Sequence, residues 1–491
     1  MDCRFQLQIN SKELQDLGDG LKSKILGKLE NLGDATIVHV AAPPEIEQLA
    51  QRITLRGDLG PLRAIFVAPG DKGLDGEYVH WDKLRHLPPP SGLDHEQWWF
   101  AIRLTRTASL QAIPLRDAAG GGFSYGTPAA VQRLLHYVDR HCSGEIAMSD
   151  VVSDEQARRH YLVNSLMEEA IRSSQLEGAT TTRKVAKELL RTGRSPKDRS
   201  ELMILNNYRA LEFMREGMGE RLEPATVLEL HRILTEGTLD DPTAAGRLQS
   251  EADERVAVVD ATDGSVMHNP PPAAQLPARL QALCDFANQR DEDSEGFIHP
   301  AVRAILLHFW LAYDHPFEDG NGRTARALFY WYMRTRGYWM VEYLSISRIL
   351  RDAPAKYSRA FLLTETDGGD TTYFLLHQLR TIERAVEELH VYLRRKVSEV
   401  RDVERLIEGA AGLNHRQLAL LSDAIRHPDD LYTYQSHATS HRVTHETARN
   451  DLLQLHDRGL LRRRKSGRRH VYSAVVDLPG ALKQLSGSNS K

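Results

Sequence analysis

A stretch of twelve residues, HPFEDGNGRTAR at 315–326, gathers the residue types needed to bind and activate a phosphate group. Its triplet Gly-Asn-Gly at 320–322 stands where a loop passes into a helix. Glycines let backbone N–H groups approach a ligand closely, and a helix N-terminus favours an anion because its first N–H groups lack partners. Arg323 and Arg326 are three residues apart, so we expect them to share one helix face. Two guanidiniums beside such a nest suit a polyphosphate.

Two further side chains in this stretch could supply chemistry. His315 lies just before the triplet, where its imidazole could take a proton from a hydroxyl that attacks bound phosphorus. Asp319 could hold Mg²⁺, a hard cation that prefers carboxylate and phosphate oxygens. The alternative is an ordinary loop between helices, which leaves the fixed offsets of the His, Asp and Arg residues unexplained. The chain lacks G-x-x-x-x-G-K-[ST], so an ordinary P-loop is excluded.

Helical spacing predicts the elements that position this stretch. Apolar residues at i, i+3, i+4 and i+7 indicate a helix over 199–217, and Pro224 suits the first turn of another. The apolar helix IHPAVRAILLHFWLAY (298–313) runs into the loop, and a helix from about Arg323 runs out of it. A β-branched run, a turn and three prolines at 255–272 predict a β-hairpin.

The chain divides by pattern into three predicted domains. Residues 1–150 read as a mixed α/β region to which we assign no function, 151–400 as a mainly helical core, and 401–491 as a separate module. The order helix, helix, helix, β-hairpin in the last part is that of a winged helix-turn-helix. The fold class is therefore mainly α.

The N-terminal region carries short predicted elements. We expect strands at 35–42 and 63–69 and a turn at 118–126. Trp98 and Trp99 fit a hydrophobic core better than a functional site.

The C-terminal module carries basic residues on its predicted recognition helix and wing. Such residues suit phosphate contacts, which give DNA affinity independent of sequence. A solvated charge run and a winged helix used for protein contacts or homodimer formation are the alternatives. The candidate DNA-binding residues are Arg449, Asn450, Arg462, Arg463, Arg464 and Lys465.

Composition places few limits on the class of partner. The chain of 491 residues has a formal net charge of −4, so it is no polycation, and its 41% hydrophobic residues suffice for conventional cores. Its three cysteines are far apart, which argues against a disulfide framework or a cysteine zinc site. The first residues lack a signal-peptide core, and no segment approaches the roughly 18 apolar residues of a membrane span. We expect a cytoplasmic protein without a membrane segment.

The stretch at 315–326 resembles, residue for residue, the Fic signature HxFx(D/E)GNGRxxR. The resemblance extends over about 151–400 and implies a helical Fic core whose hairpin is a flap that registers an extended target segment by strand addition. It implies a protein adenylyltransferase that transfers AMP from ATP to a Ser, Thr or Tyr hydroxyl of a target protein. By that similarity His315 is the general base, Asp319 holds Mg²⁺, Gly320, Asn321 and Gly322 form the anion hole, and Arg323 and Arg326 contact the outer phosphates.

A second motif, SSQLEG at 173–178, ends a helix predicted over 155–178. With Ser173, Glu177 and Gly178 at its fixed positions, it resembles the inhibitory motif (S/T)xxxE(G/N) of Fic proteins whose inhibitory helix precedes the core. By that similarity Glu177 pairs with Arg326 and occupies the site that the γ-phosphate needs, which turns the α-phosphate of ATP away from in-line attack. A plain helix C-cap is the structural alternative.

Two other functions stay open. In related animal enzymes the same glutamate helps to position a water that removes AMP, so AMP removal could dominate. The third interpretation is a nucleotide-gated DNA-binding regulator, in which the core acts as a sensor.

Overall fold

The computed structural model describes most of the chain. The described residues are 8–10, 40–55, 77–143, 155–253, 255–259, 266–289, 296–408, 412–426, 430–466 and 469–487.

The chain forms two compact units. The first comprises Met1–Gly144 and Val163–Val386, and the second comprises Glu145–Leu162 and Glu387–Lys491. Helix α18 (Thr372–Glu408) runs without interruption through position 400, where the sequence indicated a domain boundary. The predicted boundary at residue 400 thus lies inside a helix. The division into three domains stays a prediction.

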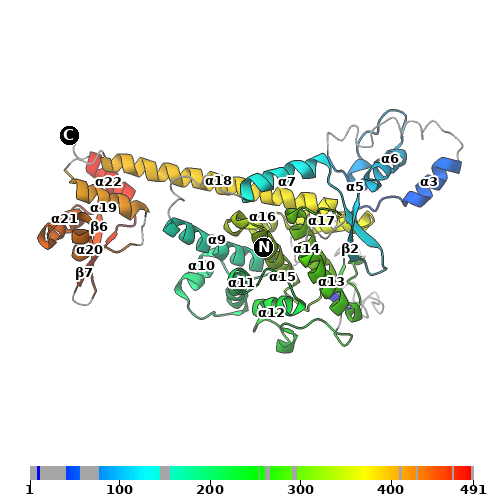
Figure 1. Ribbon diagram of the computed structural model, residues 1–491, viewed down its shortest axis with the longest axis horizontal. Coiled ribbons are helices and arrows are strands. Elements are labelled where there is room, and N and C mark those ends of the chain that lie inside the picture. Colours follow the sequence, from blue (N-terminus) through cyan, green and yellow to red (C-terminus); the bar gives the residue numbers. More distant parts are fainter. Residues whose placement is uncertain are drawn as a thin grey trace, which may run out of the picture. The chain divides into compact units, whose positions relative to one another are not determined.

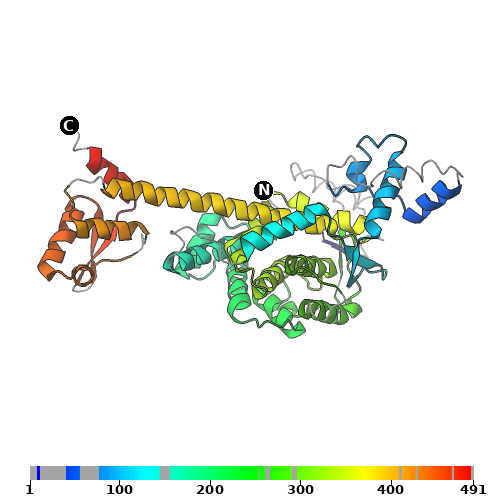
Figure 2. The same cartoon turned by 45° about the horizontal axis from the view of Figure 1, so that its top comes forward.

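The first unit is mainly helical, as predicted, and its centre is α15 (Asn321–Thr335). Helix α15 packs against α11 (Arg199–Glu216), α12 (Pro224–Thr235) and α14 (Pro300–Asp314). Figures 1 and 2 show these helices, coloured green to yellow-green, gathered around it. Further helices of this unit are α9 (Glu155–Leu176) from Val163 onward, α10 (Arg183–Thr192), α13 (Leu276–Asn288), α16 (Ile346–Asp352) and α17 (Pro354–Thr366).

The sequence of α14 explains its place in the core. Pro300 occupies the first turn, and the His299 side chain caps it by accepting a hydrogen bond from the Ala301 N–H. Nearly every later residue is buried, and most are apolar, including Leu307 and Trp310. A helix buried on all sides must be enclosed by other elements, which makes α14 a rigid support for the loop at its C-terminus.

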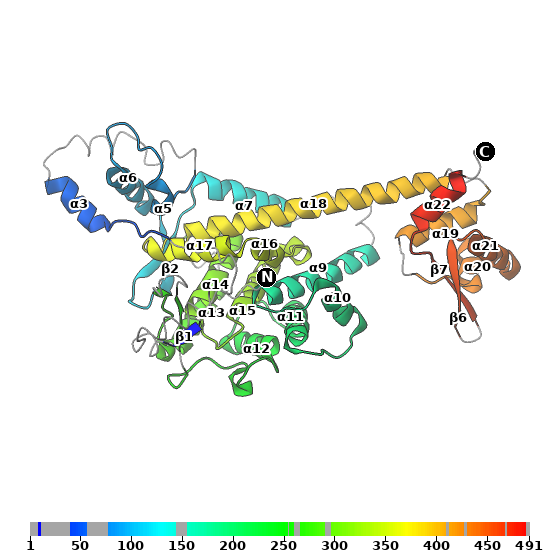
Figure 3. The ribbon, with the colours of Figure 1, turned by 180° about the vertical axis from the view of Figure 1, so that it is seen from behind.

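A hairpin of β4 (Val256–Val259) and β5 (Val266–His268) lies within the segment predicted to form one. It belongs to a three-stranded antiparallel sheet in the order β1-β4-β5, because β1 (Gln8–Asn10) pairs with the other edge of β4. The register places Gln8 opposite Val258 and Asn10 opposite Val256. The label of β1 is visible in the rear view of Figure 3. Nothing in the sequence alone indicated this pairing.

The N-terminal region contains α3 (Ile46–Leu55), α5 (Trp81–Leu84), α6 (His95–Thr107) and α7 (Ala129–Cys142). Trp98 and Trp99 are buried in one hydrophobic cluster with Leu49 and Ile102, as expected of core residues.

The predicted turn at 118–126 was wrong in its second half. Strand β2 (Gln111–Arg116) pairs with β3 (Gly122–Tyr125), because Phe123 and Tyr125 alternate into the core and outweigh the glycines before them. The predicted strand at 63–69 lies outside the described residues, as does most of 35–42, whose described end from Val40 is not in a strand.

The C-terminal residues have the element order that the sequence indicated. Helices α19 (His415–Arg426), α20 (Tyr434–His441) and α21 (His445–Asp457) precede a hairpin of β6 (Leu461–Ser466) and β7 (Arg469–Ala474), and α22 (Leu478–Gly487) follows. Their small core is built around Leu421, Leu452, Leu455, Leu461 and Tyr472. Among all described helices, none has the length and apolar character needed to cross a membrane.

Candidate active site

The signature segment (residues 315–326) is a tight connection between the two central helices. His315 adopts the left-handed conformation, with φ of 45°, and its N–H donates to the Leu311 carbonyl at 3.1 Å to end α14. Gly320, with φ of 84°, stands at the N-terminus of α15. Such backbone angles suit glycine, so the first N–H groups of α15 are presented at the end of a sharp turn.

Asn321 holds this connection closed with its side chain. Its Oδ1 accepts a hydrogen bond from the Phe317 N–H at 2.9 Å, and its Nδ2 donates to the Phe317 carbonyl at 2.8 Å. The same Nδ2 lies 3.2 Å from the ring nitrogens of His315. The side chain of Asn321 therefore links the histidine to the loop, and the predicted anion nest is left to backbone groups.

The two arginines of the segment have separate partners. Arg323 is fully buried and donates to the Leu234 carbonyl at 3.0 Å and to Oδ2 of Asp319 at 3.2 Å. Through these two hydrogen bonds the guanidinium of Arg323 connects the loop to the end of α12. Arg326 is also buried and donates through Nε to Ser173 Oγ at 3.0 Å and through Nη2 to Glu177 Oε1 at 2.9 Å.

Glu177 lies in the nest itself. A Cβ added to Gly322 would stand 2.2 Å from Glu177 Oε1 and 3.0 Å from Nη1 of Arg326. That Nη1 is buried and, among the described residues, has no hydrogen-bond acceptor. A carboxylate oxygen thus sits against the first turn of α15 beside an unsatisfied donor, which is the kind of position that suits an anion.

Helix α9 is anchored so that Glu177 reaches this position. The carboxylate of Glu169, seven residues before the end of α9, is buried and accepts hydrogen bonds from the hydroxyl groups of Ser345 and Ser347 and from the Ser347 N–H. Burial raises the pKa of Glu169, and these bonds act against that rise. Sequence reasoning missed Glu169, which reads as an ordinary polar residue of an amphipathic helix.

His315 is held so that its ring is neutral. Burial lowers its pKa to about 4, and the nearby charges of His268 and Arg255 act in the same direction. At neutral pH the imidazole can therefore accept a proton. Arg255 fixes the backbone there, because it donates to the carbonyls of Asp314 and His315 at 2.8 Å each.

Arg255 is a second residue that the sequence did not reveal. It precedes β4, so it ties the base of the hairpin to the end of α14. Burial lowers the pKa of Arg255 to about 10, and Asp314 acts against that shift. Apart from Oε1 of Gln249, the acceptors of Arg255 are backbone carbonyls, which leave no trace in side-chain patterns.

Asp319 is suitably placed for one metal contact. Its side chain is 40% exposed, with Oδ1 accepting from the Gly320 N–H at 2.5 Å. Within the described part of the chain no group of three or more His, Cys, Asp or Glu could bind a metal alone. Mg²⁺ commonly uses one or two carboxylates together with waters and substrate phosphates, so a single carboxylate beside a phosphate site fits this ion.

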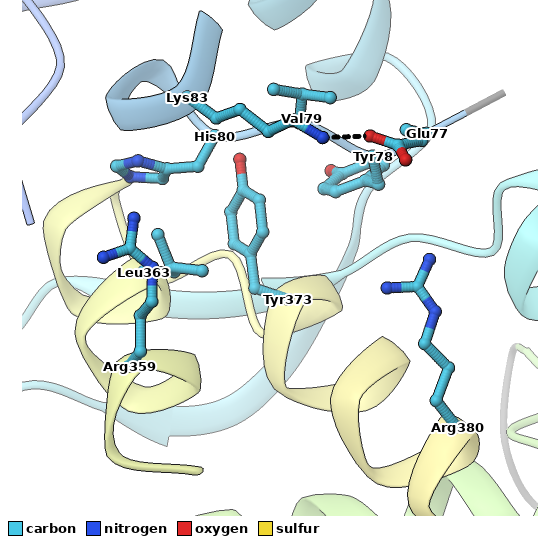
Figure 4. A pocket seen from close by; sticks show the side chains of 9 residues that line it. All are labelled: Glu77, Tyr78, Val79, His80, Lys83, Arg359, Leu363, Tyr373 and Arg380. Carbon is cyan, nitrogen blue, oxygen red and sulfur yellow. Dashed lines mark hydrogen bonds and ion pairs between the residues drawn. The ribbon is translucent and has the colours of Figure 1, made fainter. Parts of the chain in front are cut away.

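A cavity of about 230 Å³ lies elsewhere in the first unit (Figure 4). Tyr78 and Tyr373 meet edge to face in its wall, and the basic side chains of Lys83, Arg359 and Arg380 also line it. None of its lining residues belongs to the signature segment. It does not contribute to the candidate site.

The predicted DNA-binding residues are all on the surface of the C-terminal elements. Arg449 and Asn450 are exposed on α21, and Arg449 pairs with Glu446 at 3.4 Å. Four consecutive basic side chains are exposed along β6, namely Arg462, Arg463, Arg464 and Lys465.

Known proteins share the segment that builds this geometry. Residues 221–333, which contain the whole signature segment, match the model of the Fic/DOC family. The protein adenylyltransferase Fic of Nematostella vectensis is 26% identical over 228 residues, which are 45% of this chain and 49% of that protein. The protein of the same name from Drosophila willistoni is 29% identical over 199 residues, 39% of this chain and 36% of that protein. The chain thus spans less than half the length of these curated relatives.

Solved structures of Fic proteins are similar as well. A Fic family protein from Desulfovibrio desulfuricans G20 is 19% identical with a TM-score of 0.44, covering 71% of this chain and 96% of that one. A variant of Fic-1 from C. elegans is 18% identical with a TM-score of 0.47, covering 77% of this chain and 99% of that one.

Proposed function

Because residues 221–333 match the model of the Fic/DOC family, we propose that this chain is a protein adenylyltransferase that moves AMP from ATP onto a Ser, Thr or Tyr hydroxyl of a target protein. One observation carries the proposal. The neutral ring of His315 is linked through Asn321 to a turn whose backbone N–H groups and buried Arg326 form an anion site. The curated relatives bear the name of this activity.

The reaction balances with these groups. The target hydroxyl oxygen forms a bond to the α-phosphorus of ATP, and the bond from that phosphorus to the oxygen bridging to the β-phosphate breaks. Pyrophosphate leaves with the bonding electron pair, and the hydroxyl proton passes to a ring nitrogen of His315. The N–H groups at the start of α15 stabilise charge on the phosphate oxygens, since they are fixed before the substrate arrives.

Asp319 would hold Mg²⁺ together with phosphate oxygens of the nucleotide, and the ion would neutralise charge on the leaving diphosphate. Arg323 would act behind the loop, because its guanidinium is fully buried against Leu234 and Asp319. Of the two arginines, Arg326 is the one that reaches the nest.

Glu177 would keep this site in an inhibited state. Its carboxylate takes the hydrogen bond that Arg326 would otherwise donate to a γ-phosphate, and it stands against Gly322. A nucleotide could then bind with its α-phosphate out of line for attack. Ser173 contributes by accepting from Nε of the same arginine, so Arg326 is held from two positions on one helix turn.

The hairpin of β4 and β5 would receive the target by strand addition, a mode in which backbone hydrogen bonds provide much of the affinity. Strand β1 of this chain already pairs with the outer edge of β4. A target segment that uses that edge would have to displace Gln8–Asn10.

The test uses ATP labelled on the α-phosphate or on the γ-phosphate, incubated with a Glu177→Gly variant and cell lysate. Label from the α-position on protein supports AMP transfer. Label from the γ-position alone would identify a phosphotransferase and overturn the proposal. A second incubation asks whether wild-type protein releases AMP from the labelled target faster than Glu177→Gly does, since that result would make AMP removal the dominant activity.

We propose DNA binding as a second function, carried by the four consecutive exposed basic side chains on β6. Phosphate contacts of this kind give affinity that depends on salt more than on sequence. A hairpin that binds a second copy of the chain is the competing outcome, and a concentration-dependent change in size without a shift on any duplex would favour it.

A further inference from the structure

We propose that His231, on α12, is a positioning residue that sets the orientation of the Asp319–Gly320 peptide in the signature segment, and thereby keeps the carbonyl oxygen of Asp319 turned away from the nucleotide. The inference rests on the proposed adenylyltransferase function for its kinetic consequence. Its structural part stands on contacts of His231 alone.

The ring of His231 is packed directly against the signature segment. It stacks on Phe317 with ring centroids 3.7 Å apart and planes 5° apart. The side chain is fully buried. Stacking over so short a distance fixes the ring plane, so its two nitrogens can point in one pair of directions only.

Both nitrogens have partners, and these partners define the tautomer. Nδ1 faces the Gly246 N–H at 3.0 Å, and a backbone N–H can only donate. Nδ1 must therefore be the acceptor and Nε2 must carry the hydrogen. Nε2 lies 2.8 Å from the Asp319 carbonyl, which can only accept. Burial lowers the pKa of His231 to about 4, in agreement with a neutral ring.

This bond orients the peptide that opens the nest. In a trans peptide the C=O and the following N–H point in opposite directions within one plane. With the Asp319 carbonyl turned toward His231, the Gly320 N–H must face away from α12, where it meets Oδ1 of Asp319 at 2.5 Å. A rotated peptide would turn a carbonyl oxygen toward the phosphate and repel it.

The fit around Gly320 shows how closely α12 supports the turn. A Cβ at Gly320 would stand 2.7 Å from the Thr235 methyl and 3.4 Å from the His231 ring. Residues Leu234 and Thr235, one turn beyond His231, also contact the segment, since Arg323 donates to the Leu234 carbonyl. The C-terminal half of α12 is thus a template for the loop, and His231 is its one hydrogen-bond donor to the 319–320 peptide among the described contacts.

The experiment places substitutions at position 231 in the Glu177→Gly background. His231→Phe keeps a flat ring on Phe317 but has neither hydrogen bond. His231→Gln places an amide N–H near the Nε2 position, and His231→Asn can accept from Gly246 but cannot reach the Asp319 carbonyl. Val227→Ala, a buried truncation on the same helix, controls for loss of stability. The readouts are the rate of label transfer from α-labelled ATP, ATP affinity by calorimetry, thermal unfolding, and amide hydrogen exchange of the peptide spanning 316–322.

We expect His231→Phe and His231→Asn to lower the maximal rate at least about tenfold and to speed hydrogen exchange in that peptide, while His231→Gln recovers most of both. Val227→Ala should lower the unfolding temperature and leave the rate and the exchange of that peptide near those of the parent. Equal behaviour of the Gln and Asn variants, or rates within twofold of the parent for all three, would overturn the inference. A Glu177→Gly parent that transfers no AMP would instead contradict the proposed function, and the hydrogen-exchange comparison would still decide the role of His231.

Discussion

The carboxylate of Glu177 accepts a hydrogen bond from Nη2 of Arg326 at 2.9 Å, although the two residues are 149 positions apart. The arginine is 3% exposed and the glutamate 23%, so water screens this pair less than a surface ion pair. The contact links the end of α9 to the first turns of α15, and its removal should free Arg326 for the nucleotide.

Glu177→Gly is expected to raise AMP transfer by roughly 10- to 100-fold, because a charge-assisted hydrogen bond of about 1.5–3 kcal/mol no longer competes with the nucleotide. The measurement is label incorporation from α-labelled ATP. The matched control is Glu168→Gln, which removes a carboxylate on the same helix that pairs with Arg172 and Arg183. Equal labelling by wild type and Glu177→Gly would show that this contact does not inhibit.

His315→Ala, in the Glu177→Gly background, is expected to reduce transfer by about 10²–10⁴-fold and to leave ATP affinity near the parent value, since the imidazole accepts a proton and the nest holds the phosphates. Calorimetry and label incorporation separate the two effects. His299→Ala serves as a control at the other end of α14, where it removes a cap. Transfer within threefold of the parent would exclude His315 as the base.

Asp319→Ala is expected to raise the Mg²⁺ concentration for half-maximal activity at least about tenfold, because it removes the carboxylate that directly precedes the nest and could contact the ion. A Mg²⁺ titration of both proteins measures this. Glu318→Ala removes the neighbouring carboxylate and should leave the titration unchanged. An unchanged midpoint in Asp319→Ala would place the metal contact on another residue.

Buried histidines are expected to make the fold sensitive to mild acid. Burial lowers the pKa of His231, His315 and His377 to about 4, below the ordinary value of 6.5. The unfolded chain therefore binds more protons in this range, and their contribution to stability is complete above pH 6.5 and is lost as pH falls toward 4. Asp367 opposes this trend, because burial raises its pKa to about 6 and its protonation favours the fold.

Urea unfolding at pH 7 and pH 5 checks the prediction. Wild-type protein should lose stability between the two. His377→Gln should lose less, by on the order of 2 kcal/mol, because the range from the ordinary histidine pKa down to pH 5 is about 1.5 pH units at about 1.4 kcal/mol each. An identical loss in the two proteins would contradict the lowered pKa of His377.

The 491-residue chain is expected to shift duplex DNA at about 50 mM salt, with log K falling by roughly 0.9 per phosphate contacted as log salt rises. Replacing Arg462, Arg463 and Arg464 by Ala should flatten that dependence. Replacing Arg394 and Arg395, exposed on α18, is the control for loss of positive charge. A dimer in analytical ultracentrifugation without any DNA shift would support the protein-contact alternative.

Candidate site residues could be proposed where they are contiguous in sequence. The segment from His315 to Arg326 holds the proposed base, the proposed metal contact and the glycine turn within one loop, so residue type and spacing sufficed to propose them, and their roles stay predictions. Its supports were not predictable, since Arg255 and His231 act on backbone carbonyls 59 and 88 positions away. Every residue has a backbone carbonyl, so a contact with one leaves no signal in the types of residue along the sequence.

For the fold, too, local sequence patterns could be predicted from and long-range pairings could not. Helices with strong apolar periodicity were predicted, as was the hairpin at β4 and β5. The strand β3 was mistaken for a turn because the glycines before Phe123 hid an alternation of two residues. Strand β1 is only three residues long, so its sequence pattern is too short to predict a strand. Its pairing with β4, more than two hundred positions away, could not be predicted either.

The proximity of Glu177 to Gly322 limits which substitutions could release the proposed inhibition. Any side chain at 322 would expel the carboxylate, because its first carbon would stand 2.2 Å from Oε1, but it would also fill the space proposed for a phosphate. The carboxylate of Glu177 and the proposed phosphate would occupy the same space. A substitution at 322 that removes the carboxylate would therefore also prevent the phosphate from binding. In a random-mutagenesis screen for hyperactive clones, the hits should fall on Ser173 and Glu177, and codon 322 should yield inactive clones alone.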